Sequence, residues 1–195
     1  MYHEGNRDLQ DRFGSRALAD RLETMIRRER FTEDDAAFIR AQSFFFLATA
    51  DGEGRPDCSY KGGAPGFVRV MAPDLLIFPD YDGNGMFKSL GNLAVNPHVG
   101  LLFLGMGEAP KRLRVNGRAS LVLDDPLMAD FAGAQALVRV TPQDIFPNCP
   151  RYIPKLELVE PSEYAPRAGE PPLEPKWKSM EGFRDVTPPR ARKTD

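Results

Sequence analysis

The residues best suited to chemistry lie between Tyr81 and Pro97, where a turn rich in glycine and asparagine leads directly into a predicted short helix. Lys88 and Ser89 fall in the first turn of that helix. The first backbone N–H groups of a helix have no partner within it, and the helix dipole makes this end positive. With an ammonium and a hydroxyl beside them, these groups can bind a phosphate monoester. The spacing therefore predicts an anion site, with a plain loop-to-helix junction and a solvent-facing lysine as the alternative.

A second set of cations lies on the predicted strand from Lys111 to Leu123. Because successive side chains of a strand point to opposite faces, Arg112, Arg114 and Asn116 share one face. If that face borders the Lys88 turn, both arginines can donate charge-assisted hydrogen bonds to an anion or to an electron-rich ring. An exposed sheet face with solvated arginines is the alternative.

Composition and charge exclude several classes of function. The 195 residues are 42% hydrophobic, which suffices for one sizeable core. A net charge of −2 gives no reason to expect a nucleic acid or an anionic membrane as partner. Two cysteines, Cys58 and Cys149, and two histidines offer no clustered ligands, so no metal site is expected. No leader or long apolar run is present, and we expect a soluble, cytoplasmic protein.

The remaining pattern predicts a mainly β protein with peripheral helices. Helical periodicity is found over residues 15–30, after the N-cap Thr32, and over residues 86–95. Strands are expected over residues 44–49, 55–61, 67–71, 75–78, 98–104, 111–123 and 136–140. Six or so short antiparallel strands with one inserted helix indicate a closed barrel.

Three parts are expected along the chain: an N-terminal helical segment over residues 1–42, a barrel domain over residues 43–160, and an extended proline-rich arm over residues 161–195. Two aromatic residues of the arm, Trp177 and Phe183, indicate that part of it docks on the barrel. No serine–histidine–acid set, paired carboxylate motif or glycine-rich dinucleotide fingerprint is present, so the catalytic residues are unknown. A phosphate-bearing cofactor would supply the missing reactivity.

The order of these motifs resembles the pyridoxamine 5′-phosphate oxidase-like family of FMN-binding split barrels. The resemblance covers roughly residues 44–140, and the matching motifs are Gly52-x-Gly54-x-Pro56, Ser59-Tyr60-Lys61, Phe78-Pro79-Asp80, Lys88-Ser89, Asn96-Pro97 and Arg112-Leu113-Arg114-Val115-Asn116-Gly117. It implies a six-stranded antiparallel split β-barrel of the FMN-binding type.

The resemblance also implies which residues hold the FMN. The strand after the Gly-x-Pro element, the end of the next strand, the helix start and the later basic strand contact the flavin in that family, the last of these usually from the other subunit. The matching positions here are Cys58, Ser59, Tyr60, Lys61, Pro79, Asp80, Tyr81, Asn84, Lys88, Ser89, Arg112 and Arg114. Lys88 and Ser89, with Asn84 as helper, would hold the phosphate.

The chain also departs from the true oxidase. Ser59 and Tyr60 stand where the oxidase has an arginine and aliphatic residues, and the segment from Phe146 to Tyr152 is closer to uncharacterised flavin-binding relatives. The resemblance therefore implies the uncharacterised flavoprotein branch rather than a pyridoxamine phosphate oxidase.

The function expected from this resemblance is that of a homodimeric oxidoreductase with FMN bound non-covalently between subunits. It would act on an unidentified small molecule, with NADPH or NADH as a possible electron donor. Arg112 and Arg114 near the pyrimidine edge of the flavin would raise its reduction potential. Two alternatives stay open: a non-enzymatic protein that stores or senses flavin or haem, and a deazaflavin-dependent reductase.

Overall fold

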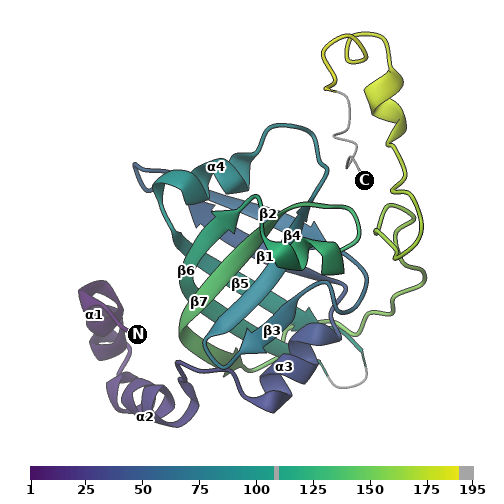
Figure 1. Cartoon of the computed structure of the whole chain (residues 1–195). Helices are drawn as coiled ribbons and strands as arrows, with labels where there is room; N and C mark the ends of the chain where they lie inside the picture. The colour runs from purple at the N-terminus through teal and green to yellow at the C-terminus, as the bar shows by residue number, and fades with distance from the viewer. Residues whose placement is uncertain (108–109, 189–195) are drawn as a thin grey trace.

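The computed structural model describes residues 1–107 and 110–188, and its centre is one antiparallel sheet in the order β2-β1-β5-β6-β7-β4-β3 (Figure 1). The strands are β1 (Phe44–Ala50), β2 (Pro56–Gly62), β3 (Arg69–Ala72), β4 (Leu75–Tyr81), β5 (His98–Gly105), β6 (Lys111–Val122) and β7 (Ala134–Asn148). The mainly β split-barrel architecture is confirmed. Two details differ, because the sheet has seven strands and, among the described residues, no pairing joins its edge strands β2 and β3. The expected closure of the barrel is therefore wrong.

Helices surround the sheet rather than cover it evenly. They are α1 (Glu4–Arg12), α2 (Arg16–Ile26), α3 (Glu33–Arg40) and α4 (Lys88–Val95), with short 3₁₀ turns η1 (Pro126–Asp130) and η2 (Lys176–Ser179). Thr32 begins α3 as predicted, since its hydroxyl accepts from the Asp35 N–H and the Asp35 carboxylate accepts from the Thr32 N–H, both at 3.1 Å. The helix α1 was not predicted, because it buries no residue and so carries no apolar stripe.

The core lies on the inner face of the sheet. Alternation along β1 sends Phe45 inward, where its ring lies 5.0 Å from that of Phe78 and 5.2 Å from that of Phe103. The helix α4 adds Leu90 and Leu93 to the same cluster. Burial of these two side chains fixes the position of α4 against the sheet, and with it the start of the helix.

Prolines and one glycine shape the long strands. The strand β6 bends at Gly117, where the register with β7 shifts and an added Cβ would lie 2.3 Å from the Thr141 carbonyl oxygen. The strand β4 was expected to end at Pro79, yet it continues to Tyr81, because Pro79 still pairs with Leu137 of β7. The strand β7 was expected to span five residues and spans 15, since its prolines fall at the bulge and near its end, where a missing N–H is tolerated.

The arm leaves the sheet after β7 and contains only η2 as a regular element within residues 161–188 (Figure 1). It packs closely against the turn before β7, where an added Cβ at Gly133 would lie 3.1 Å from the Cβ of Pro166. In the described part of the chain, no helix combines the length and the apolar character that a membrane crossing requires.

Candidate cofactor site

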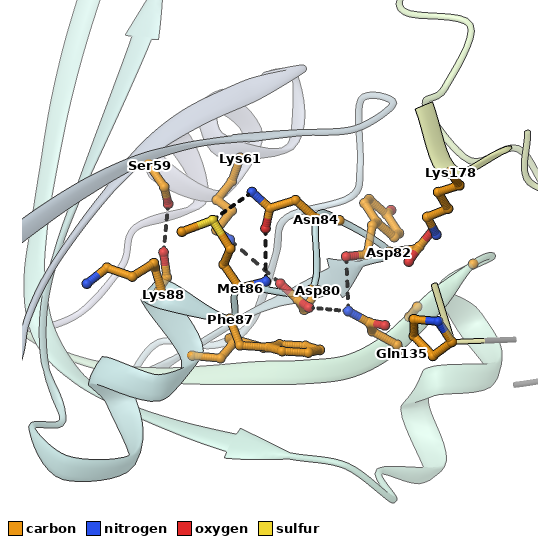
Figure 2. Close-up of a pocket in the computed structure, with 18 of the residues that line it drawn as sticks. Ser59, Lys61, Asp80, Asp82, Asn84, Met86, Phe87, Lys88, Gln135 and Lys178 are labelled. Atoms are coloured by element: carbon orange, nitrogen blue, oxygen red, sulfur yellow. Dashed lines mark hydrogen bonds and ion pairs between the residues drawn. The ribbon is translucent and has the colours of Figure 1, made fainter. Parts of the chain in front are cut away.

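A cavity of about 970 Å³ lies where the start of α4 meets β2, the end of β4, the start of β7 and the arm (Figure 2). Its volume is at the upper end of the range for small-molecule sites. The residues of its wall come from four separate stretches of chain: 57–61, 80–90, 128–135 and 172–188. The fold therefore assembles this cavity from segments that are far apart in the sequence.

The first turn of α4 borders one end of the cavity. Ser89 is buried at 5% exposure, and its hydroxyl oxygen lies 2.9 Å from that of Ser59 on β2. The N-cap Phe87 forms no side-chain cap, so it does not use the first N–H groups of the helix. These N–H groups and the two hydroxyls form a donor set that suits an anion.

Phe87 has an unusual backbone conformation for a residue of the cavity wall. Its φ of 49° is left-handed, and among the described residues it is the only non-glycine residue with a positive φ. Such a conformation costs free energy and persists where the surrounding structure imposes it, often at binding sites. The side chains of Met86 and Phe87 are 66% and 55% exposed, which leaves apolar surface at the cavity.

Three lysines line the cavity, and they differ in their partners. Lys61 pairs with Asp80 at 3.6 Å, and Lys178 of the arm pairs with Asp82. Lys88 has an exposed side chain and, among the described residues, no ion pair. Figure 2 shows its ammonium pointing away from the Asp80 and Gln135 side chains, on the side of Ser59. The free positive charge is therefore at the α4 end of the cavity.

The opposite part of the wall carries a neutralised polar network. The Asp80 side chain, in a residue 8% exposed, accepts from the Gln135 amide at 2.8 Å in addition to pairing with Lys61. The same amide nitrogen donates to the Tyr81 carbonyl at 3.1 Å. These contacts hold the ends of β4 and β7 together and leave the Asp80 charge compensated.

Tyr81 lies half-buried between this network and the core. Burial raises the pKa of its phenol to about 12, because the phenolate would lose solvation, while the positive charge of Arg69 acts in the opposite direction. The phenol is therefore neutral at physiological pH and available as a hydrogen-bond donor.

Eight of the twelve predicted site residues line the cavity: Cys58, Ser59, Lys61, Asp80, Tyr81, Asn84, Lys88 and Ser89. The side chain of Asn84 is turned toward its own loop, where its oxygen accepts from the Met86 N–H at 3.0 Å and its amide nitrogen lies 3.3 Å from the Met86 sulfur. Asn84 thus shapes the turn before α4.

The other four predicted residues lie outside the wall of this cavity. Tyr60 is 62% exposed and stacks on Phe44, with ring centroids 5.3 Å apart. Pro79 is buried within β4. Arg112 and Arg114 point outward from β6, as the alternation predicted, and Arg112 donates to the Cys149 carbonyl at 3.1 Å. Within one chain these arginines therefore do not reach the Lys88 turn.

Sequence reasoning missed several residues of the wall. Asp57, Met86, Phe87, Gln135 and Lys178 line the cavity without having been singled out as ligands. Trp177 and Phe183 were expected to dock, and they do so at the cavity, with ring centroids 5.8 Å apart. An isolated tryptophan in a polar, proline-rich segment was the one signal that could have placed the arm at the site.

These features define a class of protein, a split barrel with an uncapped helix start beside a ligand-sized cavity. A model of the pyridoxamine 5′-phosphate oxidase family matches residues 31–155, which is more than half of the chain. The chain belongs to the pyridoxamine 5′-phosphate oxidase family. No curated protein matched the sequence.

Several solved structures are similar to this chain at low sequence identity. HupZ of Group A Streptococcus is 18% identical over 60% of this chain and 93% of its own, with a TM-score of 0.48. HutZ, the haem storage protein of Vibrio cholerae, is 24% identical over 60% and 94%, with a TM-score of 0.45. An FMN-binding protein of Syntrophomonas wolfei is 12% identical over 72% and 97%, with a TM-score of 0.44.

Proposed function

We propose that this protein binds FMN in the large cavity and acts as an FMN-dependent oxidoreductase on a small molecule. One observation carries the proposal. Lys88, which forms no ion pair with any described residue, lies at one end of a cavity of about 970 Å³ together with the paired hydroxyls of Ser59 and Ser89 and the uncapped start of α4. That donor set fits the terminal phosphate of a mononucleotide, which carries up to two negative charges and accepts several hydrogen bonds.

The rest of the cavity suits the uncharged ring system of a flavin. Lys61 and Asp80 compensate each other's charge, and the Gln135 amide is already bound to Asp80. Backbone and side-chain groups at the ends of β2 and β4 can therefore fix the polar edge of a ring by hydrogen bonds without placing a net charge against it. When bound, the FMN supplies the electron and hydride chemistry, and the protein supplies orientation and electrostatics.

The two histidines bear on the haem alternative. Neither His3 nor His98 belongs to the wall of the cavity, and His98 lies at the exposed start of β5 beside Arg118. A haem in this cavity would therefore lack the usual imidazole ligand from the same chain. This arrangement favours a flavin.

We further propose that the protein is a homodimer whose cofactor lies at the interface. A row of paired residues crosses the outer face of the sheet from Tyr60 through Phe46 and Leu102 to Arg114. Phe46 and Leu102 are partly exposed and Tyr60 is 62% exposed, so this row presents neighbouring apolar side chains of the kind that mark an interaction surface. A second copy covering this face would bury them and bring Arg112 and Arg114 toward the partner's cavity.

The absorption spectrum and mass of the molecule that copurifies test the proposal. A flavin spectrum and the mass of FMN would support it, and anaerobic bleaching by NADPH or NADH followed by reoxidation would support an enzyme. A Soret band would indicate haem, the mass of a deazaflavin would indicate the related reductases, and a flavin that no physiological donor reduces would indicate storage or sensing. Purified protein that neither contains nor takes up FMN would overturn the proposal.

A further inference from the structure

We propose that the arm forms a substrate subsite for a neutral, planar aromatic molecule, which stacks against Trp177 in the part of the cavity farthest from Lys88. This inference rests on the proposed function, because it names the class of molecule on which the oxidoreductase acts. The binding itself can be measured with no cofactor present.

The wall of this subsite is aromatic. Trp177 and Phe183 meet edge to face, with an interplanar angle of 89°, and both line the cavity. Paired rings hold each other in a fixed orientation and present a flat apolar surface to a ligand. Because Trp177 is the only tryptophan of the chain, the wall also carries its own spectroscopic reporter.

Contacts at two points attach the arm to the barrel. Lys178, whose side chain is only 10% exposed, pairs with Asp82 in the loop before α4. The turn at Gly133 lies against Pro166 and Pro172, where an added Cβ would come within 3.1 Å of the Pro166 side chain and 3.4 Å of the Pro172 side chain. The aromatic wall is therefore held next to the cavity by both a charge pair and close packing.

The charges of this region indicate a neutral ligand. Asp82 is compensated by Lys178, and Asp80 is compensated by Lys61, so neither carboxylate offers a free charge. Lys88, for which the described part of the chain provides no ion pair, belongs to the opposite end of the cavity. A charged group placed near Trp177 would lose hydration, and among the described residues of the wall Asp82 and Lys178 already neutralise each other.

A second, smaller cavity extends the same wall. Its volume is about 270 Å³, and it is bordered by Tyr164, Leu173 and three prolines of the arm. Trp177 and Tyr81 border both cavities. The space beside Trp177 therefore continues into the smaller cavity, along a border that includes prolines and aromatic rings, and this leaves room for a planar ring.

The test uses 4-nitroaniline, a neutral planar ring that absorbs near the emission of tryptophan. Its binding to the full chain is measured by equilibrium dialysis, with and without saturating FMN, and by quenching of Trp177 fluorescence in the cofactor-free protein. We expect saturable binding in both states. Cyclohexanol, which is not planar, should fail to displace the probe.

The decisive variant is Trp177→Leu, which removes the ring and keeps an apolar side chain. We expect it to weaken 4-nitroaniline binding about tenfold, because the stacking of two aromatic rings changes an affinity by up to about this amount. Trp177→Phe should retain most of the binding, and Lys178→Met, which frees the arm from Asp82, should weaken it severalfold. Lys176→Met is the matched control, because Lys176 lies on η2 outside the cavity wall.

The possible results distinguish a failure of this subsite from a failure of the proposed FMN binding. Non-saturable binding, binding that FMN abolishes, or equal affinities for the wild type and Trp177→Leu would overturn the subsite. If FMN fails to bind while 4-nitroaniline binds in a manner dependent on Trp177, the proposed function falls and the subsite stands. Circular dichroism and thermal melting identify a variant that has lost its fold. If Trp177→Leu is such a variant, Lys178→Met carries the comparison with its control Lys176→Met, and equal affinities for these two would overturn the subsite.

Discussion

The hydroxyl oxygens of Ser59 and Ser89 lie 2.9 Å apart, although 30 positions separate the two residues in the chain. One belongs to β2 and the other to the first turn of α4, so this contact ties the edge of the sheet to the start of the helix. Either hydroxyl can rotate to donate to a third group. The pair is thus a ready hydrogen-bonding surface beside the free ammonium of Lys88.

Replacing Lys88 tests this end of the cavity most directly. If Lys88 bonds to the FMN phosphate, Lys88→Ala should weaken FMN binding by about 1.5–3 kcal/mol, because a charge-assisted hydrogen bond is lost. The dissociation constant follows from quenching of flavin fluorescence on titration of the protein.

The matched control for Lys88→Ala is Lys176→Ala, which removes an exposed lysine from outside the cavity wall and should leave the dissociation constant unchanged. Ser89→Ala should weaken binding by a smaller amount, because Ser59 and the helix N–H groups remain. If Lys88→Ala leaves the affinity for FMN unchanged, the phosphate does not bind at the start of α4.

The anchoring of α4 gives a prediction about stability. The Asn92 amide donates to the Thr49 hydroxyl at 2.9 Å, and both residues are buried. Thr49→Val keeps the shape of the side chain but leaves the amide without this acceptor, which should cost about 1–3 kcal/mol of unfolding free energy. Equilibrium unfolding in urea measures the loss.

Thr49→Ser is the control for that variant, because it retains the hydroxyl and removes only a methyl group. It should lie closer to the wild type than Thr49→Val does. Equal unfolding free energies for Thr49→Val and the wild type would mean that the hydrogen bond makes no net contribution to the position of α4.

The start of α4 could be predicted because its signals are local. The turn chemistry of residues 82–86 and the positions of Lys88 and Ser89 need no knowledge of the rest of the fold. The alternation along β6 likewise gave the shared outward face of Arg112 and Arg114, which the structure confirms. Sequence spacing alone did not reveal which surface that face would meet, since this depends on how the other six strands of the sheet pair.

The arm and β7 show which contacts local sequence patterns do not predict. Gln135 is a plain polar residue in the sequence, and it becomes part of the site only because β7 pairs with β4 beside Asp80. Trp177 reaches the cavity through an ion pair between Lys178 and a residue 96 positions earlier. Contacts of this kind arise from tertiary packing and leave no periodicity in the sequence.

The half-buried phenol of Tyr81 predicts a loss of stability in alkali. Its pKa is raised by burial to about 12 in the folded state, against about 10 in the unfolded chain. The unfolded state therefore loses its proton first, and the stabilisation that is present below pH 10 decreases as the pH rises toward 12. Between pH 8.5 and 11 this one group should cost about 1.4 kcal/mol of unfolding free energy.

Tyr81→Phe isolates this contribution, because it keeps the ring and removes the titrating group. Urea unfolding at both pH values should show a smaller alkaline loss for the variant than for the wild type, while other tyrosines and lysines affect both proteins alike. The same alkaline loss in both would contradict a raised pKa at Tyr81.

The exposed aromatic face predicts a dimer that one charge can weaken. Tyr60 stacks on Phe44 and stands in a row with Phe46 on the outer face of the sheet. Tyr60→Glu would place a carboxylate in that row, and burying it in an interface without a partner is costly. We expect light scattering after size-exclusion chromatography to give a dimer for the wild type and a shift toward monomer for Tyr60→Glu.

Met71→Glu is the control for this variant, because Met71 is 45% exposed on β3, at the opposite end of the strand order. It should leave the mass of the particle unchanged. Because the proposed interface brings Arg112 and Arg114 to the partner's cavity, Tyr60→Glu should also weaken FMN binding, and high protein concentration should restore it by mass action. A monomeric wild type that binds FMN tightly would refute the shared site, since one chain alone would then hold the cofactor.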